Sequence, residues 1–240
     1  MRALRQNVLA WLISCVWLPL IILAMIVTLR RKRDTLGTAM VRQWGRMLLA
    51  VAGVRLVLDP DVQAELGRRR GRVLTFNHSS TLDLIVGAAL TPEGGVTVVK
   101  RELLRVPLIG QAVLLLDMLP IDRADRSRAA AQFHVAAQRM RNESLSVLIA
   151  PEGTRSKTAV LSPFKLGAFH LAMQAGVPIV PLVLHGCAAL MPSGQFSCRA
   201  GVVRVSMLAE VAPEPWSPAA MRAEAEALRE RYGVALGTPG

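Results

Sequence analysis

Apolar and polar positions alternate along residues 54–240 in a way that predicts strands followed by helices. Short runs rich in Val, Ile and Leu, typical of buried strands, lie at 54–58, 72–77, 96–99, 118–121, 146–150, 179–184 and 202–209. Runs with helical spacing lie at 81–90, 108–117, 127–141, 165–175 and 218–231. This order predicts an α/β fold in which helices cover a mixed, mostly parallel sheet. Chemistry is then expected in the loops at strand ends.

The beginning of the chain follows a different pattern. Residues 8–29 carry no charged side chain, and a helix of that length is about 33 Å long, enough to cross a bilayer core. Residues 36–51 repeat apolar side chains every three or four positions, with polar ones between, which predicts an amphipathic helix in the membrane interface. We therefore expect a membrane-associating helical segment at 1–55 and a folded domain at 56–240.

The charge of the chain is concentrated in the same segment. Of a net charge of +12, residues 1–55 contribute +8, from nine basic side chains and one acidic. A nucleic-acid-binding domain is expected to combine basic and aromatic side chains in its folded part, but only 4% of the residues are aromatic. The basic residues instead suit an anionic membrane surface, so lipids and not nucleic acid are the expected partner.

Both flanks of the apolar run are basic, which leaves two membrane arrangements. In one, the helix spans the bilayer with the more basic flank, residues 30–33, in the cytoplasm. In the other, it forms a hairpin with the second helix and dips into one leaflet. Pro19 favours the hairpin because a proline bends a helix midway. Both arrangements place the domain on the cytoplasmic face of a membrane, the inner membrane if the source is bacterial.

The clearest candidate for chemistry follows the strand at 72–77. His78 lies in the turn where that strand stops, and Asp83 lies in the first turn of the next helix, which Ser80 is expected to cap. An Asp there is also favoured by the free N–H groups alone. In the functional interpretation, Asp83 hydrogen-bonds one imidazole nitrogen. The other nitrogen then accepts a proton from a hydroxyl near neutral pH.

A second candidate follows the strand at 146–150. Pro151 ends that strand, Gly153 permits a tight turn, and Glu152 and Arg155 are expected to project from the edge of the sheet. The guanidinium of Arg155 suits a phosphate monoester, which it can bind through two charge-assisted bonds. A simple Glu–Arg surface pair is the alternative. The Gly-Lys-Thr ending of a phosphate-binding loop is missing.

Metal and disulfide chemistry are not expected. The three cysteines are Cys15, Cys187 and Cys198, which form neither a metal-ligand spacing nor an even set. They are expected to be reduced, with one in the apolar segment and two in the domain. The sequence predicts no metal and no bound cofactor.

Four ordered segments resemble the blocks of the 1-acyl-sn-glycerol-3-phosphate (lysophosphatidic acid) acyltransferase family of glycerolipid acyltransferases. These segments are His78-x-x-x-x-Asp83, Lys100 through Ile121-Asp122-Arg123, Pro151-Glu152-Gly153-Thr154-Arg155, and Phe164-Lys165-x-Gly167 through Gly176-Val177-Pro178-Ile179-Val180-Pro181. Two positions depart from the family pattern. Pro120 stands where an aromatic often precedes the Ile, and Ala150 stands where Phe is usual. Both departures leave the charged residues in place.

The resemblance implies transfer of a fatty acyl group to the sn-2 hydroxyl of lysophosphatidic acid, which gives phosphatidic acid in phospholipid biosynthesis. The donor would be an acyl thioester carried on coenzyme A or acyl carrier protein. His78 and Asp83 would be catalytic. The substrate-binding residues would be Lys100, Arg123, Glu152, Gly153, Thr154 and Arg155. The chain has no Gly-x-Ser-x-Gly elbow to supply a serine nucleophile, so attack would be direct.

Two alternatives stay open at this stage. The first keeps the chemistry but changes the acceptor to another lysolipid, such as lyso-ornithine lipid. The second is a catalytically silent lipid-binding protein attached to the membrane, against which the presence of His78, Asp83, Glu152 and Arg155 argues.

Overall fold

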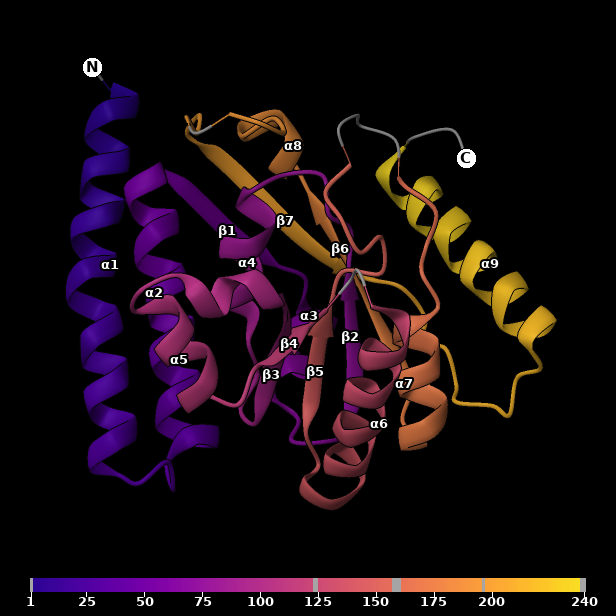
Figure 1. The fold of residues 1–240 in the computed structure, drawn as a ribbon. Coiled ribbons are helices and arrows are strands. Elements are labelled where there is room, and N and C mark those ends of the chain that lie inside the picture. The colour runs from indigo at the N-terminus through magenta and orange to yellow at the C-terminus, as the bar shows by residue number, and fades with distance from the viewer. Residues whose placement is uncertain (1, 123–124, 157–160, 196, 238–240) are drawn as a thin grey trace.

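The central feature of the fold is a seven-stranded sheet (Figure 1). The computed structural model describes residues 2–122, 125–156, 161–195 and 197–237. The strands are β1 (Val54–Leu58), β2 (Arg72–Phe76), β3 (Gly95–Lys100), β4 (Leu119–Ile121), β5 (Ser146–Ile149), β6 (Ile179–His185) and β7 (Gly201–Met207). They are ordered β1-β7-β6-β2-β5-β3-β4, and each neighbouring pair is parallel except β6 and β7. The predicted mixed, mostly parallel sheet is confirmed.

Helices cover both faces of this sheet. On one face pack α6 (Arg126–Glu143), α7 (Gly167–Ala175) and α9 (Pro218–Leu236). On the other pack α3 (Pro60–Gly67), α4 (Leu82–Leu90) and α8 (Cys187–Leu190). Every strand and helix predicted within residues 54–240 is present, within five residues at each end. The sequence did not predict the helices α3 and α8, which have eight and four residues.

Two hydrophobic cores hold the helices to the sheet. Val147, Phe169 and Tyr232 are among the fully buried side chains on the α6–α7–α9 face. Leu74 and Val86 are fully buried on the α4 face. Burying a side chain of this kind contributes about 1.5–3 kcal/mol, so both helical layers are firmly attached. The loops at the ends of the strands are thereby held on a rigid support.

The N-terminal helices form an antiparallel hairpin made of α1 (Arg2–Val27) and α2 (Thr38–Ala52), joined by a π-helical turn at Arg33–Gly37. Near one end, Gln6 Nε2 donates to the carbonyl of Ala52 over 3.1 Å. Near the other, Trp17 Nε1 donates to the carbonyl of Met40 over 2.9 Å. The helix α1 continues through Pro19 without interruption. The two helices therefore lie side by side along most of their length (Figure 1).

The second helix of the hairpin packs against the domain. Val41, Leu48 and Leu49 of α2 are buried, and α2 lies against both α1 and α4. A Cβ atom at Gly45 would come within 2.5 Å of the backbone nitrogen of Ala89, so this close approach of α2 to α4 requires glycine. The amphipathic helix predicted at 36–51 is present as α2, with its apolar side covered by α1 and α4, and its position in the membrane interface stays a prediction.

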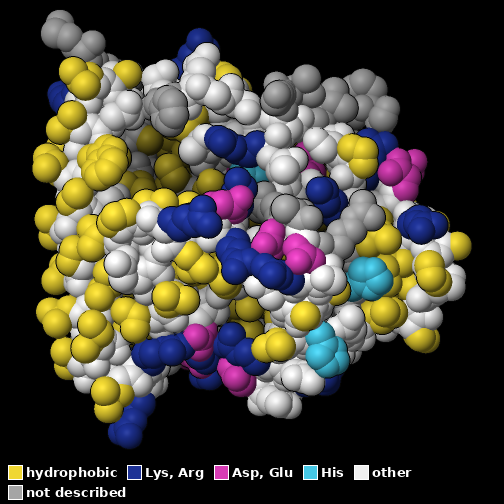
Figure 2. All heavy atoms as spheres, viewed as in Figure 1, with side chains coloured by type: hydrophobic (Ala, Val, Ile, Leu, Met, Phe, Trp, Pro, Cys, Tyr) yellow, Lys and Arg dark blue, Asp and Glu magenta, His cyan; other side chains and the backbone are white. Residues whose placement is uncertain are grey.

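The first helix presents an apolar face outward. Its exposed large apolar side chains are Leu4, Val8, Leu9, Trp11, Leu12, Val16, Leu20, Leu23, Ile26 and Val27. Figure 2 shows these apolar side chains along the edge of the molecule formed by α1. By length and composition, the segment Ala3–Val27 would be able to cross a membrane, and most of it is not buried by the rest of the described chain.

The remaining elements lie between the hairpin and the sheet edge. They are α5 (Ile109–Leu115) and a 3₁₀ helix at Arg101–Arg105. Ala112 and Leu116 pack with Leu18, Ile21 and Met25 of α1 in a third apolar cluster. The hairpin is thus anchored to the domain both through α4 and through α5.

Candidate functional site

The site is organised around the end of the central strand β2. This strand lies between β5 and β6 and is parallel to both. Because parallel strands end at the same edge of a sheet, the loops that follow these three strands converge. The loop at 77–81 therefore has the β5 loop on one side and the β6 loop on the other.

His78 and Asp83 meet in the central loop. His78 Nδ1 lies 3.2 Å from Asp83 Oδ2, and the same oxygen accepts the backbone N–H groups of Ser79 and Ser80, each over 2.7 Å. Asp83 is 0% exposed and His78 is 7% exposed. Three donors thus fix the orientation of one carboxylate oxygen and stabilise its negative charge. With Nδ1 donating to Asp83, Nε2 is the ring nitrogen left to act on a substrate.

The helix after this loop begins one residue later than predicted. Thr81, not Ser80, is the N-cap residue of α4, and its side chain makes no capping bond. Ser80 Oγ accepts the backbone N–H of Leu82 over 3.0 Å. Asp83 Oδ2 also accepts the N–H of Ser80, the residue before the N-cap. The same carboxylate therefore serves both the helix start and the imidazole.

The carboxylate of Glu152 supports the backbone of His78. Glu152 Oε1 accepts the N–H of His78 over 2.6 Å, and Oε2 accepts the N–H of Ser162 over 3.0 Å. The carbonyl of His78 accepts the N–H of Ser156 over 2.9 Å. Burial raises the pKa of Glu152, and the two backbone donors partly offset that rise. Glu152 is 1% exposed, so it points inward and does not project from the sheet edge as the sequence predicted. Its predicted part in binding substrate stays a prediction.

The end of β6 and the segment after it are bound to the other side of the central loop. Asn77 Nδ2 donates to the carbonyl of Leu184 over 3.1 Å, and its Oδ1 accepts the N–H of Leu184 over 2.8 Å. Farther along, Ser80 Oγ donates to the carbonyl of Met191 over 2.5 Å. Sequence reasoning missed Asn77, although a polar residue at the end of an apolar strand was a usable signal.

The turn after β5 brings an exposed arginine to the rim. Gly153 has a φ of 71°, which favours glycine, and the exposed Thr154 and Arg155 follow it. Arg155 Nη1 donates to Thr81 Oγ1. Arg155 therefore lies beside the start of α4. Its partner Thr81 precedes Asp83 by two positions in the sequence. Its guanidinium is placed to meet an anionic group near His78.

The other predicted binding residues lie farther along the edge. Lys100, at the end of β3, is exposed, and its Nζ lies 3.1 Å from Glu102 Oε1. Arg123 lies outside the described residues. A groove of about 560 Å³ opens at the ends of β3 and β4, at the same edge as His78, and its lining residues are Arg101, Leu104, Pro120, Arg128, Ala131 and Gln132. Its volume lies within the range typical of ligand pockets.

Comparison with known proteins identifies the family. Residues 61–185, slightly more than half of the chain, match the family model described as Acyltransferase. The chain belongs to this acyltransferase family. The matched segment contains the loops that follow β2, β3, β4 and β5, and therefore all of the predicted site residues of this acyltransferase.

Several relatives share this segment. A 1-acyl-sn-glycerol-3-phosphate acyltransferase from Cocos nucifera is 32% identical over 188 residues, which cover 78% of this chain and 60% of the relative. An enzyme of the same name from Salmonella typhimurium is 36% identical over 135 residues, which cover 56% of this chain and 54% of the relative. This acyltransferase thus spans about three fifths or less of the length of these relatives.

The fold is also found in a solved structure. The crystal structure of the 1-acyl-sn-glycerophosphate (LPA) acyltransferase PlsC from Thermotoga maritima matches with a TM-score of 0.79 and 21% sequence identity. The match covers 100% of this chain and 99% of that chain. The α1–α2 hairpin is therefore included in the shared fold.

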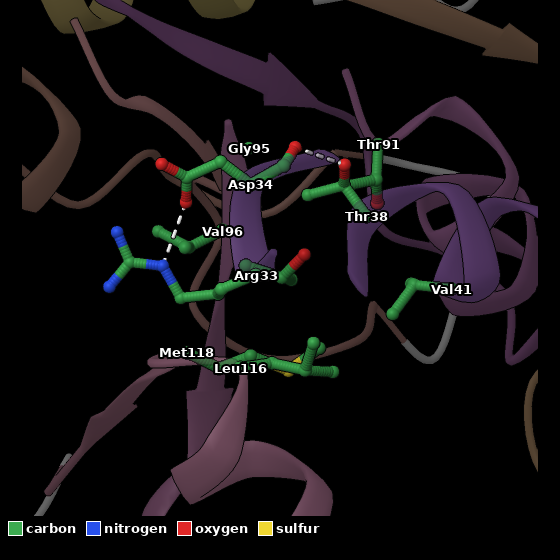
Figure 3. A pocket seen from close by; sticks show the side chains of 10 residues that line it. Arg33, Asp34, Thr38, Val41, Thr91, Gly95, Val96, Leu116 and Met118 are labelled. Carbon is green, nitrogen blue, oxygen red and sulfur yellow. Dashed lines mark hydrogen bonds and ion pairs between the residues drawn. The ribbon is translucent and has the colours of Figure 1, made fainter. Parts of the chain in front are cut away.

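A small cavity in the acyltransferase lies away from this site. It is lined in part by Arg33, Asp34, Thr38 and Gly95, and its volume of about 10 Å³ suits one water molecule (Figure 3). Gly95 begins β3, so the cavity lies at the sheet edge opposite His78. Among the described residues, no group of three or more His, Cys, Asp or Glu side chains is arranged to hold a metal ion.

Proposed function

We propose that this acyltransferase transfers a fatty acyl group from an acyl thioester to the sn-2 hydroxyl of lysophosphatidic acid, giving phosphatidic acid. The observation that carries the proposal is the contact of 3.2 Å between His78 Nδ1 and Asp83 Oδ2 at the end of β2. The names of the relatives from Cocos nucifera and Salmonella typhimurium support lysophosphatidic acid as the acceptor.

The chemistry follows from the orientation of the imidazole. In the proposed mechanism His78 Nε2 takes the proton of the acceptor hydroxyl, and the oxygen attacks the thioester carbonyl. The tetrahedral intermediate collapses with loss of the thiolate, which receives the proton from His78. Asp83 stabilises the imidazolium between these two transfers, as the carboxylate of a catalytic triad does. The products are the esterified lipid and the free thiol of coenzyme A or acyl carrier protein.

The acceptor phosphate requires a cationic site near the imidazole. Arg155 is exposed beside Thr81, at the rim of the loop that carries His78. We assign the phosphate to Arg155, with Lys100 as a further cation along the same sheet edge and Arg123 as a third candidate from the sequence. A guanidinium binds a phosphate monoester through two charge-assisted bonds. A neutral acceptor such as monoacylglycerol would lack this contact.

The acceptor is a membrane lipid, so the enzyme must meet a bilayer. We propose that the apolar outer face of α1 lies in one leaflet on the cytoplasmic side, with the catalytic domain above it. Two observations support the hairpin arrangement over a spanning helix. Gln6 and Trp17 bond α1 to α2 along most of its length, and Ile21 and Met25 of α1 are fully buried.

A panel of acceptors tests the proposal. The full-length protein, in mixed micelles with one acyl-CoA, is given lysophosphatidic acid, lyso-ornithine lipid, lysophosphatidylcholine or monoacylglycerol. We expect the highest kcat/KM with lysophosphatidic acid. A preference for the ornithine or choline lipid would overturn the acceptor while sparing His78 and Asp83. Repeating the assay with acyl-ACP identifies the donor, and lack of turnover with every pair would indicate a silent lipid-binding protein.

A further inference from the structure

The groove at the ends of β3 and β4 combines cationic and apolar side chains. Its volume is about 560 Å³, and it lies between the 3₁₀ helix and α6. Two cations, Arg101 and Arg128, line it. Its apolar lining residues are Leu104, Pro120 and Ala131. A groove of this composition suits a ligand that carries a negative charge on an otherwise neutral, partly apolar body.

The two cations come from different elements. Arg101 begins the 3₁₀ helix, and its Nη1 donates to Asp122 Oδ2 over 2.8 Å. Arg128 lies in the first turn of α6, and its Nε lies 3.1 Å from Asp125 Oδ2. A guanidinium has five N–H donors, and each of these contacts uses one of them. Both side chains can therefore also bind an anion in the groove through charge-assisted hydrogen bonds.

The shape of the groove is held by Gln132 of α6, which also lines it. Gln132 Nε2 donates to the carbonyl of Pro120 over 2.8 Å, and its Oε1 accepts the N–H of Asp122 over 3.3 Å. Both ends of one side-chain amide thus hold the end of β4 against α6. The groove is therefore built into the fold.

The groove lies level with His78 along the sheet. Val73 of β2 and Val96 of β3 both pair with Val147 of β5. His78 follows Val73 by five positions, and Arg101 follows Val96 by five. The strands lie in the order β2-β5-β3-β4. Because neighbouring strands are about 4.8 Å apart, the ends of β3 and β4 lie about 10 Å and about 14 Å from the end of β2.

This distance distinguishes the two substrates of the proposed reaction. In lysophosphatidic acid, four bonds separate the sn-2 hydroxyl oxygen from phosphorus, a span of about 5 Å at roughly 1.2 Å per bond. An acceptor with its hydroxyl at His78 therefore falls short of the groove. In a phosphopantetheine thioester, thirteen bonds separate sulfur from phosphorus, a span of about 15 Å when extended. This phosphate reaches the groove while the thioester carbonyl lies beside His78.

We propose that the groove between the 3₁₀ helix and α6 binds the phosphopantetheine arm of the acyl donor, with the phosphate held by Arg101 and Arg128. The inference rests on the proposed function, because that function supplies the thioester. Between the sulfur and the phosphate the arm is uncharged and carries a gem-dimethyl group, which suits the apolar lining at Leu104 and Pro120. Coenzyme A and acyl carrier protein share the arm and this phosphate.

The first test measures binding without turnover. Calorimetric titration of the intact chain in detergent micelles compares pantetheine 4′-phosphate with pantetheine, which lacks the phosphate. We expect wild type to bind the phosphorylated form about tenfold more tightly, and Arg101→Ala and Arg128→Ala each to lose most of this preference. Both arginines are exposed, so both variants should fold. The matched control is Arg141→Ala in the last turn of α6, about 20 Å along the helix from Arg128, which should keep the preference.

The outcomes of this titration separate the groove from the reaction. Equal binding of the two compounds by wild type would overturn the inference. So would a preference that survives in both Arg101→Ala and Arg128→Ala, or one that is lost equally in Arg141→Ala. The expected pattern in a protein that turns over no lysolipid would reject the proposed function and keep the groove as a phosphopantetheine site.

The second test separates donor from acceptor by steady-state kinetics with lysophosphatidic acid. Arg101→Ala and Arg128→Ala should raise the donor KM about five- to tenfold and change the acceptor KM by less than about twofold. Acyl-CoA and acyl-ACP are assayed separately, and the KM of each donor that wild type uses should rise because both carry the phosphate. Arg155→Ala should show the reverse pattern. A raised acceptor KM with an unchanged donor KM in Arg101→Ala and Arg128→Ala would assign the groove to the acceptor and overturn the inference.

Discussion

The backbone N–H of His78 donates to Glu152 Oε1 over 2.6 Å, so a loop on β2 is held by a carboxylate 74 residues later in the chain. The second oxygen of Glu152 binds the N–H of Ser162, and the N–H of Ser156 binds the carbonyl of His78. The loop after β5 therefore fixes, from one side, the backbone of His78, the proposed general base. Its position depends on Glu152.

This relationship predicts a kinetic effect of Glu152→Gln. Glutamine offers one oxygen and one NH₂ group, so one of the two backbone donors loses its acceptor. An unsatisfied buried donor costs about 1–3 kcal/mol, which should appear in the unfolding free energy and as a lower kcat. Acceptor KM should change little. The exposed Glu230→Gln on α9 is the control, and equal kinetics in the two variants would contradict the supporting role.

The raised pKa of Glu152 predicts a pH dependence of stability. Between the unfolded and the folded pKa of this carboxyl, the folded state binds more protons than the unfolded state. Its contribution to stability is therefore full below the unfolded pKa and is lost as pH rises through the folded pKa. The free energy of unfolding, measured with denaturant for wild type and for Glu152→Gln from pH 4 to pH 7, isolates the contribution of this carboxyl. The wild-type advantage should shrink as pH rises, and an advantage that grows would refute the prediction.

Removal of the proposed base predicts loss of turnover without loss of fold. His78→Ala should lower kcat by about 10²–10⁴-fold, the usual contribution of a general base. Asp83→Asn should also impair turnover severely, since it removes the charge that stabilises the imidazolium. The exposed His170→Ala on α7 is the control. A near-normal rate in His78→Ala, with an unchanged thermal melt, would reject the mechanism.

Loss of Arg155 predicts a weaker acceptor interaction. Arg155→Ala should cost about 1.5–3 kcal/mol in kcat/KM for lysophosphatidic acid, mostly through a higher acceptor KM. Acyl-donor KM should change less, and the exposed Arg222→Ala should change neither. The same loss is expected for Arg123→Ala. If Arg155→Ala retained its preference for lysophosphatidic acid over monoacylglycerol, the phosphate would have to be bound elsewhere.

The outer face of α1 predicts how the protein binds lipid. Deleting residues 1–55 would expose the face of α4 that α2 covers, so a charge on α1 is the sharper probe. Trp11 is 72% exposed, and Trp11→Glu should lower binding to anionic vesicles by about tenfold or more while the fold remains. Val234 on α9 is 82% exposed, so Val234→Glu is the matched control. Equal flotation of the two variants would place the lipid contact elsewhere.

The features that the sequence predicted correctly are those set by residues close together along the chain. The strands and the helices α4, α5, α6, α7 and α9 were found from their apolar periods, and the contact of His78 with Asp83 spans only five positions. The inward turn of Glu152 was missed because it depends on β5 lying next to β2. The bonds from Asn77 to Leu184 were missed for the same reason, since they require β6 on the other side. Strand order is set by packing over the whole chain, and no local pattern contains it.

The position of Gly45 has a consequence for how lipid reaches the active site. The helices α1, α2 and α4 are stacked in contact, and α4 carries Asp83 in its first turn. With α1 in the lipid, the height of the catalytic pair above the bilayer is set by two helix-to-helix spacings, about 16–20 Å together. Because these three helices pack directly on one another, the fold fixes this height. A lysolipid acceptor of the proposed kind would then have to rise or tilt to this height, and its own reach would limit which hydroxyl meets His78.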